Sequence, residues 1–74
     1  MSTRLEYLVV APDCMTDEEI KDFCKEADVT LEKTYKVLTF LFCISFEASR
    51  LLEVMTFFNS YACKLEPNSE RMLA

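Results

Sequence analysis

The sequence predicts one small α+β domain whose elements follow the order β-α-β-β-α-β. Apolar residues alternate along 36–46, which is the period of a strand. They then recur every three or four residues from Ala48 to Phe58, which is the period of an amphipathic helix. A second helical pattern begins after Thr16, and a chain of 74 residues is long enough for one core only.

The first strand and the first helix are predicted at residues 4–11 and 17–27. The segment 4–11 (RLEYLVVA) is rich in β-branched and aromatic residues, and both of its faces are largely apolar, as in a central strand. Thr16 and Glu19 match a capping box, in which a hydroxyl and a carboxylate each accept a backbone N–H at the start of a helix. The apolar stripe of this helix consists of Ile20, Phe23, Cys24 and Ala27.

Residues 28–35 alternate between apolar and polar side chains, and we expect an edge strand here. The next strand is predicted at 36–45, after a tight turn at 32–34. The alternative is a helix that continues through Leu31, Tyr35 and Leu38, which would leave a three-stranded β-α-β-α-β layer.

The second helix is predicted at 47–60, with Asn59 and Ser60 in place of the usual terminal glycine. Val54 and Phe57 lie beside its main stripe, and they either widen the buried face or add surplus apolar surface. A short last strand follows at 62–66, and residues 67–74 are expected to close it and fray. The main stripe consists of Ala48, Leu51, Leu52, Met55 and Phe58, and Cys63 and Leu65 point inward from the last strand.

This order of elements resembles the ferredoxin-like plait, in which two split βαβ units place both helices on one face of a four-stranded antiparallel sheet. The resemblance lies in the pattern across 4–66 and includes no family motif. It implies that the other sheet face is open, and the residues expected there are more apolar than those of a face meant for water. An apolar open face usually meets a partner or another copy, so we expect a homodimer. The residues expected on this face are Val37, Thr39, Leu41, Cys43 and Ser45 on the third strand, with Glu6, Leu8 and Val10 on the first.

The composition excludes several kinds of site. The chain has no glycine, which rules out a glycine-rich phosphate loop, and no histidine, which removes the usual general base and the commonest metal ligand. Its four cysteines form no CxxC pair, so zinc-ribbon and thioredoxin-type sites are not expected. Cys24, Cys43 and Cys63 are predicted to be small core residues, while Cys14 lies in a loop. We therefore expect a protein that is not an enzyme and has no catalytic, cofactor-binding or metal-binding residues.

The negative charge is concentrated in residues 13–32, which hold eight acids and two bases, whereas the whole chain has a net charge of −5. Such a segment repels nucleic acid and anionic membranes and attracts basic protein surfaces. We therefore expect a protein partner with a basic surface, bound through the outward face of Glu18, Asp22 and Glu26. The alternative is a solvated helix face that only keeps the protein soluble.

The N-terminal residues lack the basic region, apolar core and cleavage site of a secretory signal. The longest apolar run, 37–46, is too short to span a bilayer. We therefore expect a cytoplasmic protein with reduced thiols.

Three functional classes remain, and we favour a protein-interaction module or inhibitor. Small acidic proteins of viral or mobile-element origin often block a basic cleft by imitating the phosphate spacing of nucleic acid. The plait is also similar to ACT-type regulatory domains, which pair side by side and sense ligands. Those domains generally have a glycine in the loop after the first strand, where this chain has Ala11-Pro12-Asp13-Cys14.

RNA binding is the third class, because the plait also looks like an RNA-recognition domain. The run 36–42 has the leading lysine of the RNA-binding motif and two aromatic residues, Phe40 and Phe42. It lacks the glycine and the first aromatic residue of that motif. Phe40 and Phe42 also share the parity of Leu38 and Ile44, so we expect them to face the core.

Overall fold

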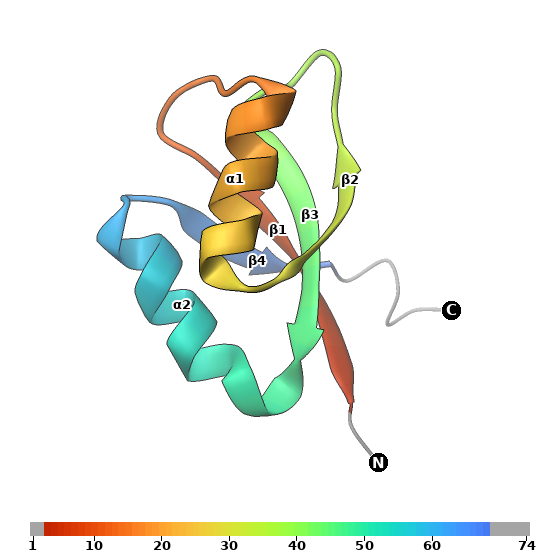
Figure 1. Ribbon diagram of the computed structural model, residues 1–74, viewed down its shortest axis with the longest axis vertical. Helices are drawn as coiled ribbons and strands as arrows, with labels where there is room; N and C mark the ends of the chain where they lie inside the picture. The colour runs from red at the N-terminus through yellow and green to blue at the C-terminus, as the bar shows by residue number, and fades with distance from the viewer. Residues whose placement is uncertain (1–2, 69–74) are drawn as a thin grey trace.

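The computed structural model describes residues 3–68, and its helices and strands follow the predicted order (Figure 1). The elements are β1 (Arg4–Val10), α1 (Asp17–Ala27), β2 (Thr30–Thr34), β3 (Leu41–Glu47), α2 (Leu51–Ser60) and β4 (Lys64–Pro67). The strands form one antiparallel sheet with the order β2-β3-β1-β4, so β1 is a central strand as predicted. The fold is therefore α+β, and the helical alternative for 28–35 is wrong because this segment contains edge strand β2.

Both helices pack on the same face of the sheet, where α1 crosses in front of β1 and β3 and α2 lies beside it (Figure 1). One apolar cluster joins the two helices to this face. Its largest fully buried side chains are Phe42, Phe46, Phe58, Ile20, Ile44, Val9 and Val54. Phe42 and Phe46 alternate with Cys43 and Ser45 along β3, so the predicted parity of this strand is confirmed.

Both ends of α1 are set by residues within a few positions of the helix. At its start the predicted capping box is present, since the Glu19 N–H donates to Thr16 Oγ1 at 3.2 Å and the Thr16 N–H donates to Glu19 Oε1 at 2.9 Å. At its end Asp28 takes a left-handed conformation, with φ of 56°. The N–H of Val29 then reaches the carbonyl of Cys24, which forms a Schellman motif without glycine.

The start of α2 differs from the prediction because a 3₁₀ turn, Ala48–Arg50, precedes the helix. A 3₁₀ turn has about 3.0 residues per turn and an α-helix about 3.6. Three residues in a 3₁₀ turn therefore rotate the following side chains by about 60° relative to their positions in a continuous α-helix. Leu52, expected in the buried stripe, is consequently 79% exposed, and Val54 is buried instead. Val54 thus belongs to the core and adds no surplus surface.

Arg50, the last residue of that turn, connects the two helices. Its guanidinium donates to the backbone carbonyls of Ala27 and Asp28 at the end of α1, and it also pairs with Glu53. A cation at a helix C-terminus complements the negative end of the helix dipole. The contact therefore fixes the start of α2 against the end of α1.

The end of α2 also lacks glycine, but Asn59 and Ser60 do not replace it as expected. Ala62 takes the left-handed conformation instead, with φ of 62°. The N–H of Cys63 donates to the carbonyl of Phe58 and that of Ala62 to Asn59, both at 3.0 Å, which is again a Schellman motif. The motif turns the chain directly into β4.

The third strand begins later than predicted. Residues 36–40, expected in the strand, form a loop that closes with a turn from Leu38 to Leu41. The tight turn predicted at 32–34 is also wrong, because these residues belong to β2 and the sheet register shifts between Leu31 and Lys33. A loop of six residues replaces the tight turn, since glycine, which a two-residue hairpin turn favours, is absent here.

The last strand, β4, begins and ends later than the predicted 62–66. Pro67 pairs with Tyr7 in the sheet, and the N–H of Asn68 donates to the carbonyl of Glu6 at 3.0 Å. Residues 67 and 68 are therefore held against β1. The rest of the predicted tail, 69–74, lies outside the described residues.

Candidate functional site

One hollow in the described part of the surface is a groove of about 440 Å³ between the β1–α1 loop, one side of α1 and the chain just after α2. We call it the acidic groove, after the four carboxylates in its lining. These are Asp13 in the loop and Glu19, Asp22 and Glu26 on α1, and the aromatic rings of Phe23 and Tyr61 also line it. The groove therefore combines negative charge with an aromatic surface.

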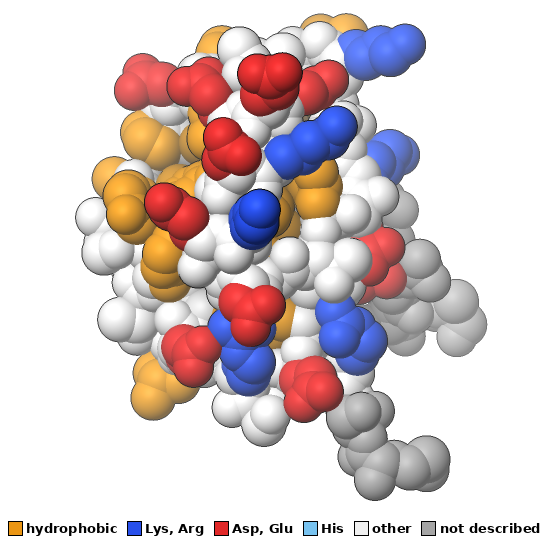
Figure 2. All heavy atoms as spheres, in the orientation of Figure 1, with side chains coloured by type: hydrophobic (Ala, Val, Ile, Leu, Met, Phe, Trp, Pro, Cys, Tyr) orange, Lys and Arg blue, Asp and Glu red, His pale blue; other side chains and the backbone are white. Residues whose placement is uncertain are grey.

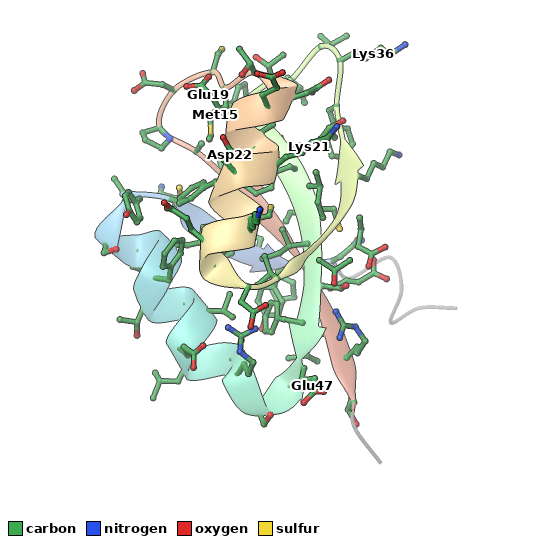
Figure 3. The ribbon with its side chains drawn as sticks, viewed as in Figure 1. Met15, Glu19, Lys21, Asp22, Lys36 and Glu47 are labelled. Carbon is green, nitrogen blue, oxygen red and sulfur yellow. The ribbon has the colours of Figure 1, made fainter. Side chains whose placement is uncertain are left out.

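The helical repeat of α1 brings its three groove carboxylates together. Residues 19, 22 and 26 are separated by three and four positions and so lie along one side of the helix. In Figure 3, Glu19, Asp22 and Met15 lie toward the β1–α1 loop, and Lys21 projects from the other side of α1 toward β2. Lys21 therefore lies on a different side of α1 from the groove carboxylates.

The aromatic part of the groove is held by ring packing between the two helices. The Phe23 ring lies 5.0 Å from Phe58, 5.4 Å from Phe57 and 5.1 Å from Tyr61, measured between centroids. Phe58 is fully buried, whereas Tyr61 remains 52% exposed. Tyr61 therefore presents part of its ring to solvent while its neighbours fix its position.

The electrostatic field of the groove is not neutralised by nearby bases. The ion pairs of Arg50 with Asp28 and Glu53 lie at the opposite end of α1 from Glu19, and neither includes a groove carboxylate. The C-terminal end of α2, which leads into Tyr61, has no basic residue in its last turn, so the negative end of its dipole adds to the field. Figure 2 shows the acidic side chains gathered over α1, beside an apolar patch where α1 meets α2.

The acidic residues singled out from the sequence are only partly brought together. Glu18, Asp22 and Glu26 are all exposed on α1, as expected. Asp22 and Glu26 line the acidic groove, whereas Glu18 does not, and Glu19 takes its place. The structure thus divides the predicted face into a groove side and a side that meets only solvent.

The residues expected to form an apolar open sheet face do not form one surface. Val37 lies in the β2–β3 loop and is 91% exposed, and Thr39 lies in the turn before β3. Leu41 and Cys43 are on the open face of β3, opposite Val10 and Leu8 of β1 as predicted. Cys43 is nevertheless buried, so it is not available to a partner.

The centre of the open face is covered by polar side chains of the protein itself. Ser45 is buried beside the polar side chains to which it is hydrogen-bonded. Its hydroxyl donates to Glu32 and accepts from Arg4, whose Nη2 lies 3.1 Å away. The Cys43 thiol donates to Glu6, and Asn68 donates to both of these groups. Burial, and next the Glu6 carboxylate, raise the pKa of Cys43. A second cavity, of about 310 Å³, lies over these groups.

The buried thiols are poorly suited to nucleophilic chemistry at neutral pH. Burial raises the pKa of Cys24 to about 11 and also raises that of Cys63, so both are protonated. Cys14 is the exposed cysteine and lines the acidic groove. No cluster of three or more potential metal ligands occurs within residues 3–68. The groove offers carboxylates and aromatic rings as binding groups.

Comparison with protein-family models, with curated proteins and with solved structures found no match to this chain. Within the described part of the chain, neither helix is long and apolar enough to cross a membrane.

Sequence reasoning missed Glu19, Phe23 and Tyr61 as groove residues. Glu19 was assigned to the capping box, a role that it does fill, and Phe23 was assigned to the core. Tyr61 was not assigned to any site. One signal was available in the sequence. Phe57 and Tyr61 are four residues apart, as neighbours on one helix face are, and the first predicted helix carries acids before and after Phe23.

Proposed function

We propose that this protein is a non-enzymatic interaction module that binds a basic segment of a partner protein in the acidic groove. The observation that carries the proposal is the combination of four carboxylates with the exposed ring of Tyr61 in one hollow. Carboxylates attract a basic segment and set its rate of association, and desolvated aromatic contacts contribute most of the affinity at protein interfaces.

The size of the groove favours an extended peptide over a folded element. A volume of about 440 Å³ accommodates one or two side chains of a partner. Occupying a basic surface in this way would inhibit whatever that surface otherwise binds. We place this role in the cytoplasm, where thiols remain reduced, because the four cysteines are unpaired.

We further propose that the domain is a ferredoxin-like plait. Two facts support this: the strand order reads β4-β1-β3-β2 from the other edge, and each βαβ unit has an antiparallel strand between its own two strands. The phenylalanines that suggested RNA binding speak against that function, since Phe42 is fully buried and Phe40 packs against the core.

The proposal is tested by titrating the protein with a fluorescent peptide of alternating arginine and alanine and recording anisotropy. We expect saturable binding that weakens as salt rises from about 50 to about 300 mM, because the Debye length shrinks. Iodoacetamide labelling of Cys14 should slow when the peptide is bound, because Cys14 lines the groove. Absence of binding at low salt would overturn the proposal.

Two matched variants locate the binding site. The double variant Asp22→Asn with Glu26→Gln removes two charges from the groove and should weaken binding about tenfold. The control, Glu18→Gln with Glu66→Gln, removes two exposed charges outside the groove and should weaken it about twofold or less. Equal losses in both variants would mean that the peptide responds to net charge alone. If free arginine bound as tightly as the peptide, the ligand-sensing alternative would replace the proposal.

A second candidate is self-association through the open sheet face. Leu8, Val10 and Leu41 are half-buried apolar neighbours on this face, and no helix covers them. Leu41→Arg should then convert a dimer into a monomer, as measured by light scattering, with unchanged helix content. A wild-type protein that is already monomeric would exclude this candidate.

A further inference from the structure

We propose that the acidic groove selects arginine over lysine, with the guanidinium stacked on Tyr61 and paired with Asp22 and Glu26. The inference rests on the proposed function and names the side chain that the groove receives. Tyr61 contacts Phe23 at 5.1 Å between ring centroids, and Phe23 follows Asp22 directly on α1, three residues before Glu26. Tyr61, Asp22 and Glu26 line the same hollow, so a planar cation stacked on the exposed part of the Tyr61 ring would be within reach of both carboxylates.

The arrangement is rigid on the aromatic side. The Tyr61 ring meets Phe23 nearly edge-on, at an interplanar angle of 80°, and lies 5.2 Å from Phe57. The Schellman motif at Ala62 fixes the backbone just after Tyr61. A ring held in this way loses little side-chain entropy when a ligand binds, so the stacking contact is preorganised.

The chemistry of the groove suits a guanidinium better than an ammonium ion. A guanidinium is planar, stacks on aromatic rings, pairs with carboxylates through two parallel N–H groups and is weakly hydrated. An ammonium ion is strongly hydrated and would lose more on entering a groove that is lined by rings as well as carboxylates. The carboxylates of Asp22 and Glu26 have no ion-pair partner among the described side chains, so they are free to receive the cation.

The test compares three peptides of equal length, in which alanine alternates with arginine, lysine or citrulline. Their dissociation constants are measured with the whole chain by fluorescence anisotropy. We expect the arginine peptide to bind about three- to tenfold more tightly than the lysine peptide, which is the range of a cation–π contact. The uncharged citrulline peptide, which keeps the planar shape, should bind more weakly than both.

Two substitutions of the same residue assign the selectivity to the ring. Tyr61→Leu should bring the ratio between arginine and lysine peptides close to one, whereas Tyr61→Phe should preserve it. Leu52→Ala, at an exposed position of α2 outside the groove, is the control and should change neither affinity. Thermal melting of each variant verifies that it is folded.

The outcomes separate this inference from the proposed function. Equal binding of arginine and lysine peptides would overturn the selectivity while leaving a groove that recognises basic peptides. A ratio that survives in folded Tyr61→Leu would also overturn it, because the ring would then have no part in the choice. Failure of every peptide to bind would overturn both proposals.

Discussion

The two sides of strand β3 are buried to a similar extent along 42–46, but by different means. On β3, Phe42 and Phe46 lie beneath the helices, and Cys43 and Ser45 lie on the open face between them. Each of these four residues is at most 3% exposed. The first pair is covered by aromatic and aliphatic side chains, whereas the second is covered by polar side chains that reach across the open face, among them Glu32.

The difference teaches how a strand that is apolar on both sides should be interpreted. Such a strand indicates burial on both faces, and the apolar second face predicts cover by another molecule. In this fold long polar side chains fold over it and hydrogen-bond to Ser45 and Cys43. Apolar alternation therefore predicts that a face is covered, but it does not say by what.

The largest expected contrast between the faces comes from truncating adjacent residues of β3. Phe42→Ala should lower the free energy of unfolding by about 3–5 kcal/mol, because it leaves a cavity among packed rings. Cys43→Ala removes one sulfur beneath hydrogen-bonded polar groups and should cost about 1 kcal/mol. Urea titrations measure both, and Phe42→Leu serves if Phe42→Ala does not fold. Equal losses would contradict the distinction between the faces.

The pH dependence of stability tests the comparison on the sheet face that the two helices cover. Burial raises the pKa of Cys24 from 9.0 to about 11. The folded state holds this proton more tightly than the unfolded chain, so the contribution to stability is complete below pH 9. It declines above pH 9 and is lost as the pH rises through about 11.

We therefore expect the Cys24 thiol to reduce the free energy of unfolding by about 1 kcal/mol between pH 8 and pH 10. The measurement is urea unfolding at the two pH values, in the wild type and in Cys24→Ala. The variant should lose less stability across this interval, whereas Cys14→Ala, at an exposed thiol, should behave as the wild type. An unchanged pH dependence in Cys24→Ala would show that other groups cause the decline.

The polar cover of the open face is tested at Ser45. Ser45→Ala removes the hydroxyl that joins Arg4 to Glu32 and should cost about 1 kcal/mol, since both charged partners can turn to water. Ser49→Ala, at an exposed serine, is the matched control and should change stability by less than about 0.5 kcal/mol. If Ser45→Ala were neutral, the hydrogen bonds would cover the face without stabilising it.

The smallest expected effects come from substitutions at the C-terminal ends of the two helices that cover one face of the sheet. Ala62→Gly should raise the free energy of unfolding by about 0.5–1 kcal/mol, because glycine adopts a positive φ without strain. Asp28→Gly should stabilise less, since aspartate tolerates the left-handed conformation better than alanine. Thermal unfolding measures both, and destabilisation by Ala62→Gly would argue against the left-handed conformation at this position.

Local patterns predicted most of the elements. The capping box at Thr16 and the β-branched run of β1 depend on neighbouring residues only, so α1 and the central position of β1 were predicted correctly. The start of β3 was predicted wrongly because Leu38 and Phe40 continue the alternation into a loop. The buried side of α2 was predicted wrongly because no local sequence feature distinguishes a 3₁₀ turn from the first turn of an α-helix.

The candidate site was less predictable than the fold. Asp22 and Glu26 could be placed on one face from helical spacing, and both line the acidic groove. Tyr61 could not be joined to them from the sequence, because the contact with Phe23 depends on how the two helices pack. Charge could therefore be assigned to the site in advance, whereas the aromatic surface that gives it shape could not.

The strand order also has a consequence for the time course of synthesis. β1 is made before both of its neighbours in the sheet, β3 and β4, so its hydrogen-bonding groups have no native partners until those later strands emerge. Contacts between such distant segments form slowly. During this interval the apolar β1 is followed directly by the most acidic stretch of the chain, whose repulsion disfavours association between nascent copies. The same carboxylates that shape the acidic groove would thus protect the chain before the groove exists.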